Sequence, residues 1–247
     1  MGVLINEVSL SYPGTGLVID RLSTEIDDGE FIAVLGASGC GKSSLLNMIA
    51  GLLAPSSGWL EVPHDGAAFM FQDSNLLPWL TAGQNVDLAL KLAGYPAAQR
   101  TARTTELLQL VQLGHAIGKK PHELSGGMRQ RVALARALAQ DRQVLLMDEP
   151  FAALDAITRD MLHEQLRALW EQTGKTIIFV THNVREAIRL AGRILVLSSH
   201  PGRILETRQI TDNLRNDPAQ SAALANELTA ILRKEQRKHE LTDTSAG

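Results

Sequence analysis

A glycine-rich stretch, GASGCGKSS at 36–44, is the strongest candidate in the sequence for binding a phosphate group. It fits the pattern G-x-x-x-x-G-K-[ST] at Gly36, Gly41, Lys42 and Ser43. A strand-like run, FIAVL at 31–35, precedes it, and a helix is expected from about Ser43. The glycines let backbone N–H groups point inward, and the helix N-terminus adds positive potential. We expect Lys42 to reach the β- and γ-phosphates and the Ser43 hydroxyl to bind Mg²⁺; a chance match is the alternative.

Cys40, the only cysteine of the chain, lies inside this stretch. It is interpreted first as a small filler whose backbone binds the phosphate. The alternative is a thiol activated by the helix N-terminus, in which case maleimide should block nucleotide turnover and ATP should protect. A single cysteine also excludes an intrachain disulfide and fits a reducing compartment.

Two adjacent acids end another apolar run, QVLLMDEP at 143–150. Alternation along a strand predicts that Asp148 and Glu149 lie on opposite sides and serve different purposes. Asp148 is expected to hold Mg²⁺, mostly through water, and Glu149 to orient or deprotonate an attacking water. A solvated acidic turn is the weaker alternative, because a buried strand rarely ends in paired acids without a cation to meet.

Two more polar residues follow strand-like runs. His182 follows TIIFV at 176–180, and Gln72 ends AAFMFQ. The carboxyl ends of parallel strands carry ligand sites, so His182 is expected to donate a hydrogen bond to the γ-phosphate. The Gln72 amide is expected to touch Mg²⁺ or the attacking water. The alternative for a lone histidine is a structural role.

The elements that must position these residues follow from five short apolar runs, at 31–35, 67–71, 143–147, 176–180 and 193–197. Runs that are apolar on both faces predict buried, parallel strands, and the helical patterns between them predict crossover helices. The stretch 81–122 has no strand signal and is rich in Ala, Leu, Gln and Arg, which predicts an inserted helical lobe.

The chain turns polar after about residue 211. Asp217-Pro218 opens a helical pattern with its apolar face at Leu224, Leu228, Ile231 and Leu232. Packing on the core is the first interpretation of this face, and a dimer contact is the alternative. The polar end, LRKEQRKHELTDTSAG, is expected to fray at its tip.

Composition limits the class of protein. Hydrophobic residues make up 45% of the 247 residues, which is ordinary for a globular domain. The net charge of -3 argues against non-specific nucleic-acid binding. No apolar run reaches the roughly 18 residues that span a bilayer, and no basic leader precedes an apolar block. We therefore expect a cytoplasmic globular protein, and peripheral attachment to a membrane protein stays open.

One motif, LSGGMRQR at 124–131, carries no acid, base or metal ligand of its own. The joint order of the phosphate loop, Gln72, LSGGMRQR, MDEP and His182 resembles the ATP-binding subunits of ABC transporters. LSGGMRQR is the discriminating element, because other phosphate-loop enzymes lack it. The resemblance covers residues 3 to about 206.

The resemblance implies an α/β fold. This is a P-loop NTPase (RecA-like) core with a mixed sheet, an antiparallel β part and an inserted α-helical subdomain. It implies one ABC ATP-binding domain over 1–247. The core lobe takes 3–80 and 136–210, the helical signature lobe 81–135, and the C-terminal helix and tail 211–247.

The resemblance also implies a head-to-tail homodimer that sandwiches two ATP molecules. Ser125, Gly126 and Gly127 of one chain would contact the γ-phosphate held by the other chain. The two glycines allow close backbone approach, and a nearby helix N-terminus favours an anion. A two-fold arrangement completes both sites at once.

The family's functional residues transfer to matching positions in this chain. Catalysis is expected of Lys42, Gln72, Glu149 and His182, and Mg²⁺ binding of Ser43, Gln72 and Asp148. ATP binding is expected of Tyr12, Gly36, Ala37, Ser38, Gly39, Cys40, Gly41, Lys42, Ser43, Ser44, Ser125, Gly126, Gly127, Gln130 and Asp155. Tyr12 would stack on adenine, though an exposed tyrosine near a strand end is an alternative. Asp155 matches the loop that crosses the dimer axis.

The chain departs from the family pattern at three places. Asn183 replaces the aspartate that usually follows the histidine, and Ala152 stands where close relatives often have glycine. Residues 58–72 look shorter than the usual β-hairpin before Gln72. None of these changes removes a catalytic group.

Three stretches resemble the importers for nitrate, sulfonates and taurine: LLPW at 76–79, FAALDAITR and SSHPGRILE at 198–206. This implies a separate membrane permease, indirectly a solute-binding protein, and a place at the cytoplasmic face of the membrane. Leu77, Pro78 and Trp79 would help to form the groove for a permease helix, or else a packed apolar turn. An ATP-gated clamp without turnover and an exporter-type subunit are the rival functions; the presence of both Glu149 and His182 favours a motor.

Overall fold

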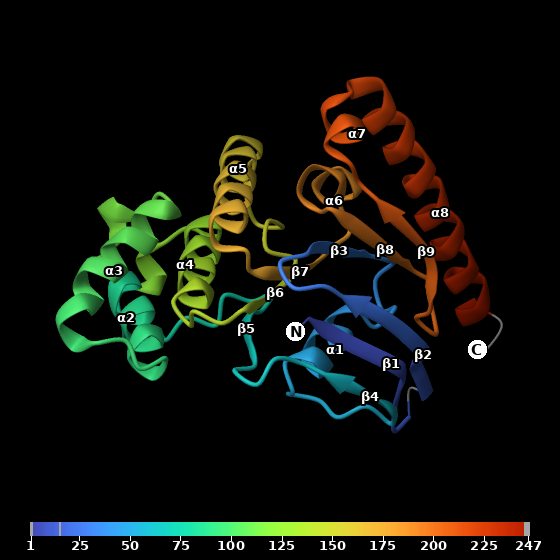
Figure 1. Cartoon of the computed structure of the whole chain (residues 1–247), viewed down its shortest axis with the longest axis horizontal. Coiled ribbons are helices and arrows are strands. Elements are labelled where there is room, and N and C mark those ends of the chain that lie inside the picture. The colour runs from blue at the N-terminus through green and yellow to red at the C-terminus, as the bar shows by residue number, and fades with distance from the viewer. Residues whose placement is uncertain (1, 15, 245–247) are drawn as a thin grey trace. The chain divides into compact units, whose positions relative to one another are not determined.

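The computed structural model describes residues 2–14 and 16–244, with side chains described as far as Lys238. The chain forms two compact units, Met1–His64 with Thr176–Gly247, and Asp65–Lys175. Figure 1 shows the elements along the chain. The helical lobe expected over 81–135 lies within the second unit, which also contains two strands and a further helix.

The first unit contains an antiparallel sheet in the order β2-β1-β4. These strands span Val3–Tyr12 (β1), Gly16–Ile26 (β2) and Ser57–Glu61 (β4). Buried and exposed positions are interleaved along β1 and β2, as in a sheet with one covered face. β4 pairs with β1, so the expected shortened hairpin is instead a strand added to the edge of this sheet.

A second group of strands in the first unit runs β7-β3-β8-β9. These are Thr176–Thr181 (β7), Phe31–Leu35 (β3), Arg193–Leu197 (β8) and Ile204–Gln209 (β9). β3 pairs in parallel with β7 and β8, and β9 runs antiparallel to β8. Every residue of β3 and β7 is buried, which confirms the interpretation of apolar runs as central parallel strands.

Four helices belong to the first unit: α1 (Lys42–Ile49), α6 (Val184–Leu190), α7 (Asp212–Asn216) and α8 (Pro218–Thr244). α8 packs against α6 and α7, with Leu224 and Leu228 buried. The expected helix at the end of the chain is therefore confirmed, and it packs on its own unit. The last three residues of the polar tail lie outside the described residues.

The second unit contains the parallel pair β5 (Ala67–Met70) and β6 (Val144–Asp148). Its helices are α2 (Ala82–Leu92), α3 (Ala97–Leu110), α4 (Gly126–Leu138) and α5 (Ala156–Thr173), with short 3₁₀ turns at Gly114–Ala116 and Pro121–Glu123. α2 begins in a capping box in which Thr81 accepts from the Gln84 N–H and the Gln84 side chain accepts from the Thr81 N–H. No helix among residues 2–14 and 16–244 is long and apolar enough to cross a bilayer.

Candidate functional site

The phosphate loop joins β3 to α1 within the first unit. α1 begins at Lys42, after Gly41 in the left-handed conformation (φ 93°). A Cβ at Gly41 would lie 2.7 Å from Cγ1 of Ile19, so a side chain is excluded both by backbone conformation and by space. The buried β3 and α1 therefore present the backbone of the loop at a helix N-terminus.

The Lys42 side chain folds back along this loop. Its Nζ donates to the carbonyls of Gly36 (2.9 Å) and Ala37 (2.7 Å), and the residue is 7% exposed. Burying an ammonium group is costly unless an opposite charge compensates it. A phosphate group in the loop would supply that charge.

Cys40 has no exposed surface, and its Sγ lies 3.8 Å from Lys42 Nζ. Burial raises the pKa of the thiol, and the neighbouring Lys42 charge only partly offsets this. The thiol is therefore protonated at neutral pH, which favours the filler interpretation over an activated nucleophile.

Tyr12, the last residue of β1, lies beside the first turn of α1. Its hydroxyl is 3.3 Å from Ser44 Oγ, and the residue is 38% exposed. A partly exposed ring next to a phosphate loop is suited to stacking on a base. Adenine contact stays a prediction.

His182 follows β7 in the same unit and is exposed. The residues on both sides of it are held by one buried carboxylate, Glu186. Thr181 Oγ1 donates to Glu186 Oε2 (2.7 Å), and Asn183 Nδ2 donates to Glu186 Oε1 (3.1 Å). Asn183 Oδ1 also caps α6 by accepting from the Arg185 N–H. The asparagine at 183, where the family usually has aspartate, therefore donates a hydrogen bond from its amide to Glu186.

The two acids of the second unit differ in backbone and burial. Asp148 is the last residue of β6 and is 6% exposed. Glu149 lies beyond the strand, half-buried, with a left-handed backbone (φ 47°). The alternation argument therefore does not reach Glu149, because the strand has ended before it. Non-glycine residues held in this conformation cost about 1–3 kcal/mol and cluster at functional sites.

The signature stretch opens α4. Ser125 caps the helix by accepting from the Met128 N–H (3.2 Å), and both Ser125 and Gly126 are exposed. A Cβ at Gly126 would meet one atom within 4 Å, the Arg129 Nη2 at 3.9 Å. A Cβ at Gly127 would lie 3.2 Å from the Ala153 carbonyl oxygen and from Leu154 Cδ2. Space within the chain therefore explains the glycine at 127 but not at 126.

α4 also holds the segment that begins at Gln72. The buried Gln130 donates through Nε2 to the Gln72 carbonyl (3.1 Å), so its amide is used within the chain. Arg136 donates to the carbonyls of Asn75 (2.6 Å) and Ser74 (2.7 Å). Gln72 itself is exposed. Nucleotide contact by Gln130 stays a prediction.

Asp155 is exposed and caps α5 by accepting from the Thr158 N–H (3.0 Å). Hydrogen bonding from Thr158 lowers the pKa of this carboxyl. Asp155 is thus ionised near neutral pH, and its position in the dimer stays a prediction.

The expected Mg²⁺ donors suit that ion chemically. Ser43 offers a hydroxyl in the first turn of α1, Gln72 an amide and Asp148 a carboxylate, all oxygen ligands of the kind that Mg²⁺ prefers. Within the described residues, no group of three or more His, Cys, Asp or Glu side chains forms a metal cage. This donor set fits an ion that keeps waters and shares phosphate oxygens.

Sequence reasoning missed Asn85 on α2, which is 1% exposed. Its Oδ1 accepts from the Leu77 N–H (2.8 Å), and its Nδ2 donates to the Thr81 carbonyl (2.9 Å). It therefore fixes the LLPW turn. Beside this turn lies a hollow of about 320 Å³, lined among others by Leu77, Leu88, Leu92 and Arg136. A polar residue on the apolar face of the helical pattern was the available signal for Asn85.

Comparison with known proteins decides the family. The family model described as ABC transporter matches residues 19–152. The taurine import ATP-binding protein TauB of Rhizobium johnstonii is 44% identical over 238 residues, covering 90% of this chain and 91% of the relative. The chain belongs to the ABC transporter family. It is an ATP-binding domain and an ATPase of this family, as its phosphate loop and signature stretch predicted.

Two further proteins are similar to this chain. The bicarbonate transport ATP-binding protein CmpC of Synechocystis is 49% identical over 203 residues, covering 78% of this chain and 30% of the relative. The dimeric structure of the ATP-binding cassette MJ0796 bound to ADP and Pi has a TM-score of 0.78 and 32% identity. That match covers 85% of this ABC domain and 99% of the solved chain.

Proposed function

We propose that this ABC ATPase is the ATP-hydrolysing subunit of an importer, coupled to a separate membrane permease. The exposed residues Ser125 and Gly126 at the start of α4, which we call the signature corner, are the observation that supports the proposal. Within the described residues, no packing against another element requires glycine at 126. A position kept free of side chain at an exposed helix N-terminus suits close approach of an anion from another molecule.

In the proposed reaction, Lys42 binds the β- and γ-phosphates and the loop N–H groups orient them. Ser43, Gln72 and Asp148 would hold Mg²⁺, which would neutralise the negative charge of the phosphates. Glu149 orients the attacking water and accepts its proton. His182 donates a hydrogen bond to the γ-phosphate. Its neighbours Thr181 and Asn183, which donate to Glu186, hold the backbone at His182 in place.

The proposed assembly is a two-fold homodimer with two ATP molecules. The signature corner of each chain would contact the γ-phosphate bound in the loop of the other, with Asp155 near the axis. The dimeric MJ0796 cassette with ADP and Pi supports this arrangement by likeness. Isologous packing makes both sites from one interface.

The permease is proposed to bind at the hollow beside the LLPW turn. Leu92, which lines this hollow, is 79% exposed, and Trp79 in the LLPW turn is 66% exposed. Exposed apolar patches of this kind mark interaction surfaces, and an amphipathic helix in a groove is a common occupant. The subunit would then be peripheral, at the cytoplasmic face of the membrane, and a solute-binding protein would act through the permease.

The relatives named for taurine and bicarbonate support a small anionic or zwitterionic solute, such as nitrate, a sulfonate or taurine. Uptake of labelled taurine, nitrate and bicarbonate in cells with and without the gene tests this. We expect one uptake to disappear on deletion and return with the wild-type chain but not with Lys42→Ala. A purified chain that binds ATP without turnover, even with its permease, would instead support the clamp.

A further inference from the structure

The turn between β8 and β9, residues 198–203, lies against the phosphate loop within the first unit. Gly202 in this turn is buried; its N–H donates to the Val18 carbonyl (2.7 Å), and its carbonyl accepts from the Asp20 N–H (3.1 Å). A Cβ at Gly202 would lie 2.2 Å from the carbonyl oxygen of Cys40. Gly202 is therefore in close contact with the loop, and no other residue fits there unless the loop backbone moves.

This contact bears on the direction of a loop N–H group. The peptide bond between Cys40 and Gly41 is trans, so the Cys40 carbonyl and the Gly41 N–H point in opposite directions. Gly202 lies on the carbonyl side, which directs the Gly41 N–H away from the turn. On the Gly41 side of this peptide bond, the side chains of Val18 and Ile19 of β2 leave no room for a Cβ at Gly41. The orientation of this peptide plane is thus set from outside the loop.

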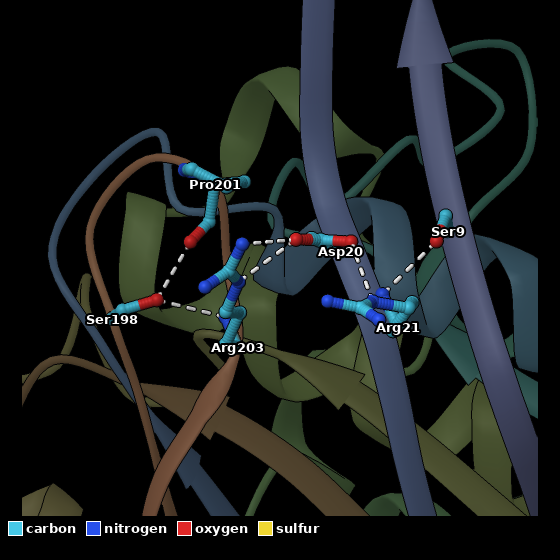
Figure 2. A network of polar contacts seen from close by, with 6 residues as sticks. All are labelled: Ser9, Asp20, Arg21, Ser198, Pro201 and Arg203. Atoms are coloured by element: carbon cyan, nitrogen blue, oxygen red, sulfur yellow. Dashed lines mark hydrogen bonds and ion pairs between the residues drawn. The ribbon is translucent and has the colours of Figure 1, made fainter.

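The turn is braced by its own polar contacts (Figure 2). Ser198 Oγ donates to the Pro201 carbonyl (2.6 Å) and accepts from the Arg203 N–H (2.8 Å). Arg203 forms an ion pair with Asp20 of β2, with Nε to Oδ2 at 2.9 Å. These contacts tie the turn to the strand that carries Val18 and Ile19.

α8 holds the same turn from the C-terminal part of the chain. Glu235 is 5% exposed, and its Oε2 accepts from the Ser199 N–H (3.2 Å) and lies 3.5 Å from Ser199 Oγ. Burial acts to raise the pKa of Glu235, but hydrogen bonds from Lys238 and Ser199 outweigh it, so the pKa is lowered. Glu235 is therefore a charged acceptor at neutral pH.

We propose that the turn 198–203 packs against the phosphate loop and fixes its backbone conformation. Gly202 and Glu235 are then positioning residues for nucleotide binding. Gly202 keeps the Cys40–Gly41 peptide plane with its N–H toward the bound phosphates, and Glu235 keeps the turn in place. Neither residue touches the nucleotide. The inference rests on phosphate binding in the loop.

The test compares Glu235→Ala, Glu235→Gln and Gly202→Ala with the wild type in the full-length chain. We measure the Kd for MgATP, the KM and kcat of ATP hydrolysis, and the melting temperature. Glu235→Ala should raise Kd and KM about three- to tenfold, with kcat at saturating ATP much less affected. Glu235→Gln keeps the oxygen acceptor and should restore Kd to near the wild-type value. Gly202→Ala should raise Kd at least about tenfold, because its methyl group displaces the Cys40 carbonyl.

Glu227→Ala is the matched control on the same helix. Glu227 pairs with Arg208 of β9, which lies outside the turn 198–203, so its loss should leave Kd unchanged. Wild-type Kd in folded Glu235→Ala would overturn the proposal, as would equal effects of Glu235→Ala and Glu227→Ala on Kd. If Gly202→Ala does not fold, the Glu235 variants decide. A wild-type chain that binds no MgATP would count against the phosphate site itself instead.

Discussion

At the scale of single residues, the two glycines of the signature have different surroundings. A Cβ at Gly127 would press on Ala153 and Leu154, whereas one at Gly126 would meet, among the described residues beyond its own helix backbone, only the end of the Arg129 side chain. A confined glycine is needed for packing within its own chain. An unconfined one at an exposed helix start fits the proposed contact with a nucleotide held by a second chain.

Gly126→Val and Gly127→Val should therefore separate stability from function. Gly127→Val should lower the free energy of unfolding by about 1–3 kcal/mol through overpacking. Gly126→Val should change it by no more than about 0.5 kcal/mol yet reduce ATP hydrolysis at least about tenfold. Urea unfolding and ATPase rates measure both quantities. Normal hydrolysis by Gly126→Val would contradict the proposed contact with a second chain's nucleotide.

The raised pKa of Cys40 makes a second prediction at this scale. Because the buried thiol is protonated below its raised pKa, the native protein should react with maleimide far more slowly than urea-unfolded protein. Labelling followed by mass spectrometry measures both rates. Rapid labelling of the folded chain that ATP prevents would restore the activated-thiol hypothesis.

At the scale of elements, the pattern of apolar residues predicted the buried strands, because burial on both faces directly selects such residues. The five apolar runs became β3, β5, β6, β7 and β8, because strands buried on both faces have no polar residues to interrupt them. β9 was not predicted, since its alternating half-buried and exposed residues include Glu206, Thr207 and Arg208. The antiparallel part containing β1 and β2 was expected only from the family resemblance.

The same limit applies to the site. The phosphate loop and signature were predictable because their chemistry lies in consecutive residues. Asn85, Gly202 and Glu235 act through contacts with residues distant in sequence or on another element, such as Ser199 with Glu235. No spacing rule links such positions. The strand-alternation prediction for Glu149 failed for another reason. It assumed that the alternation of a strand continues to Glu149, but β6 ends at Asp148 and Glu149 has a left-handed backbone.

A prediction about the LLPW turn concerns its proposed contact with the permease. Trp79 is 66% exposed, so Trp79→Ala should change the free energy of unfolding by no more than about 0.5 kcal/mol. ATPase activity of the free subunit should stay nearly intact, while coupling to the permease weakens. Trp59→Ala, at a 46% exposed tryptophan on β4, is the control and should leave transport unchanged. Unchanged transport in Trp79→Ala would count against the docking site.

At the scale of the whole molecule, the proposed catalytic residues are divided between the two units. The phosphate loop, Tyr12 and His182 belong to the first, and Gln72, the signature, Asp148 and Glu149 belong to the second. We propose that a second chain must complete each nucleotide site. ATP binding and dimer formation should then be one event.

The most direct test uses Glu149→Gln, which should bind MgATP but hydrolyse it at least about a hundredfold more slowly. Light scattering coupled to gel filtration measures its mass with and without MgATP. We expect twice the 26.8 kDa of one chain with MgATP, and the mass of a single chain when Gly126→Val is added. A nucleotide-saturated Glu149→Gln protein that keeps the mass of one chain would contradict the proposal.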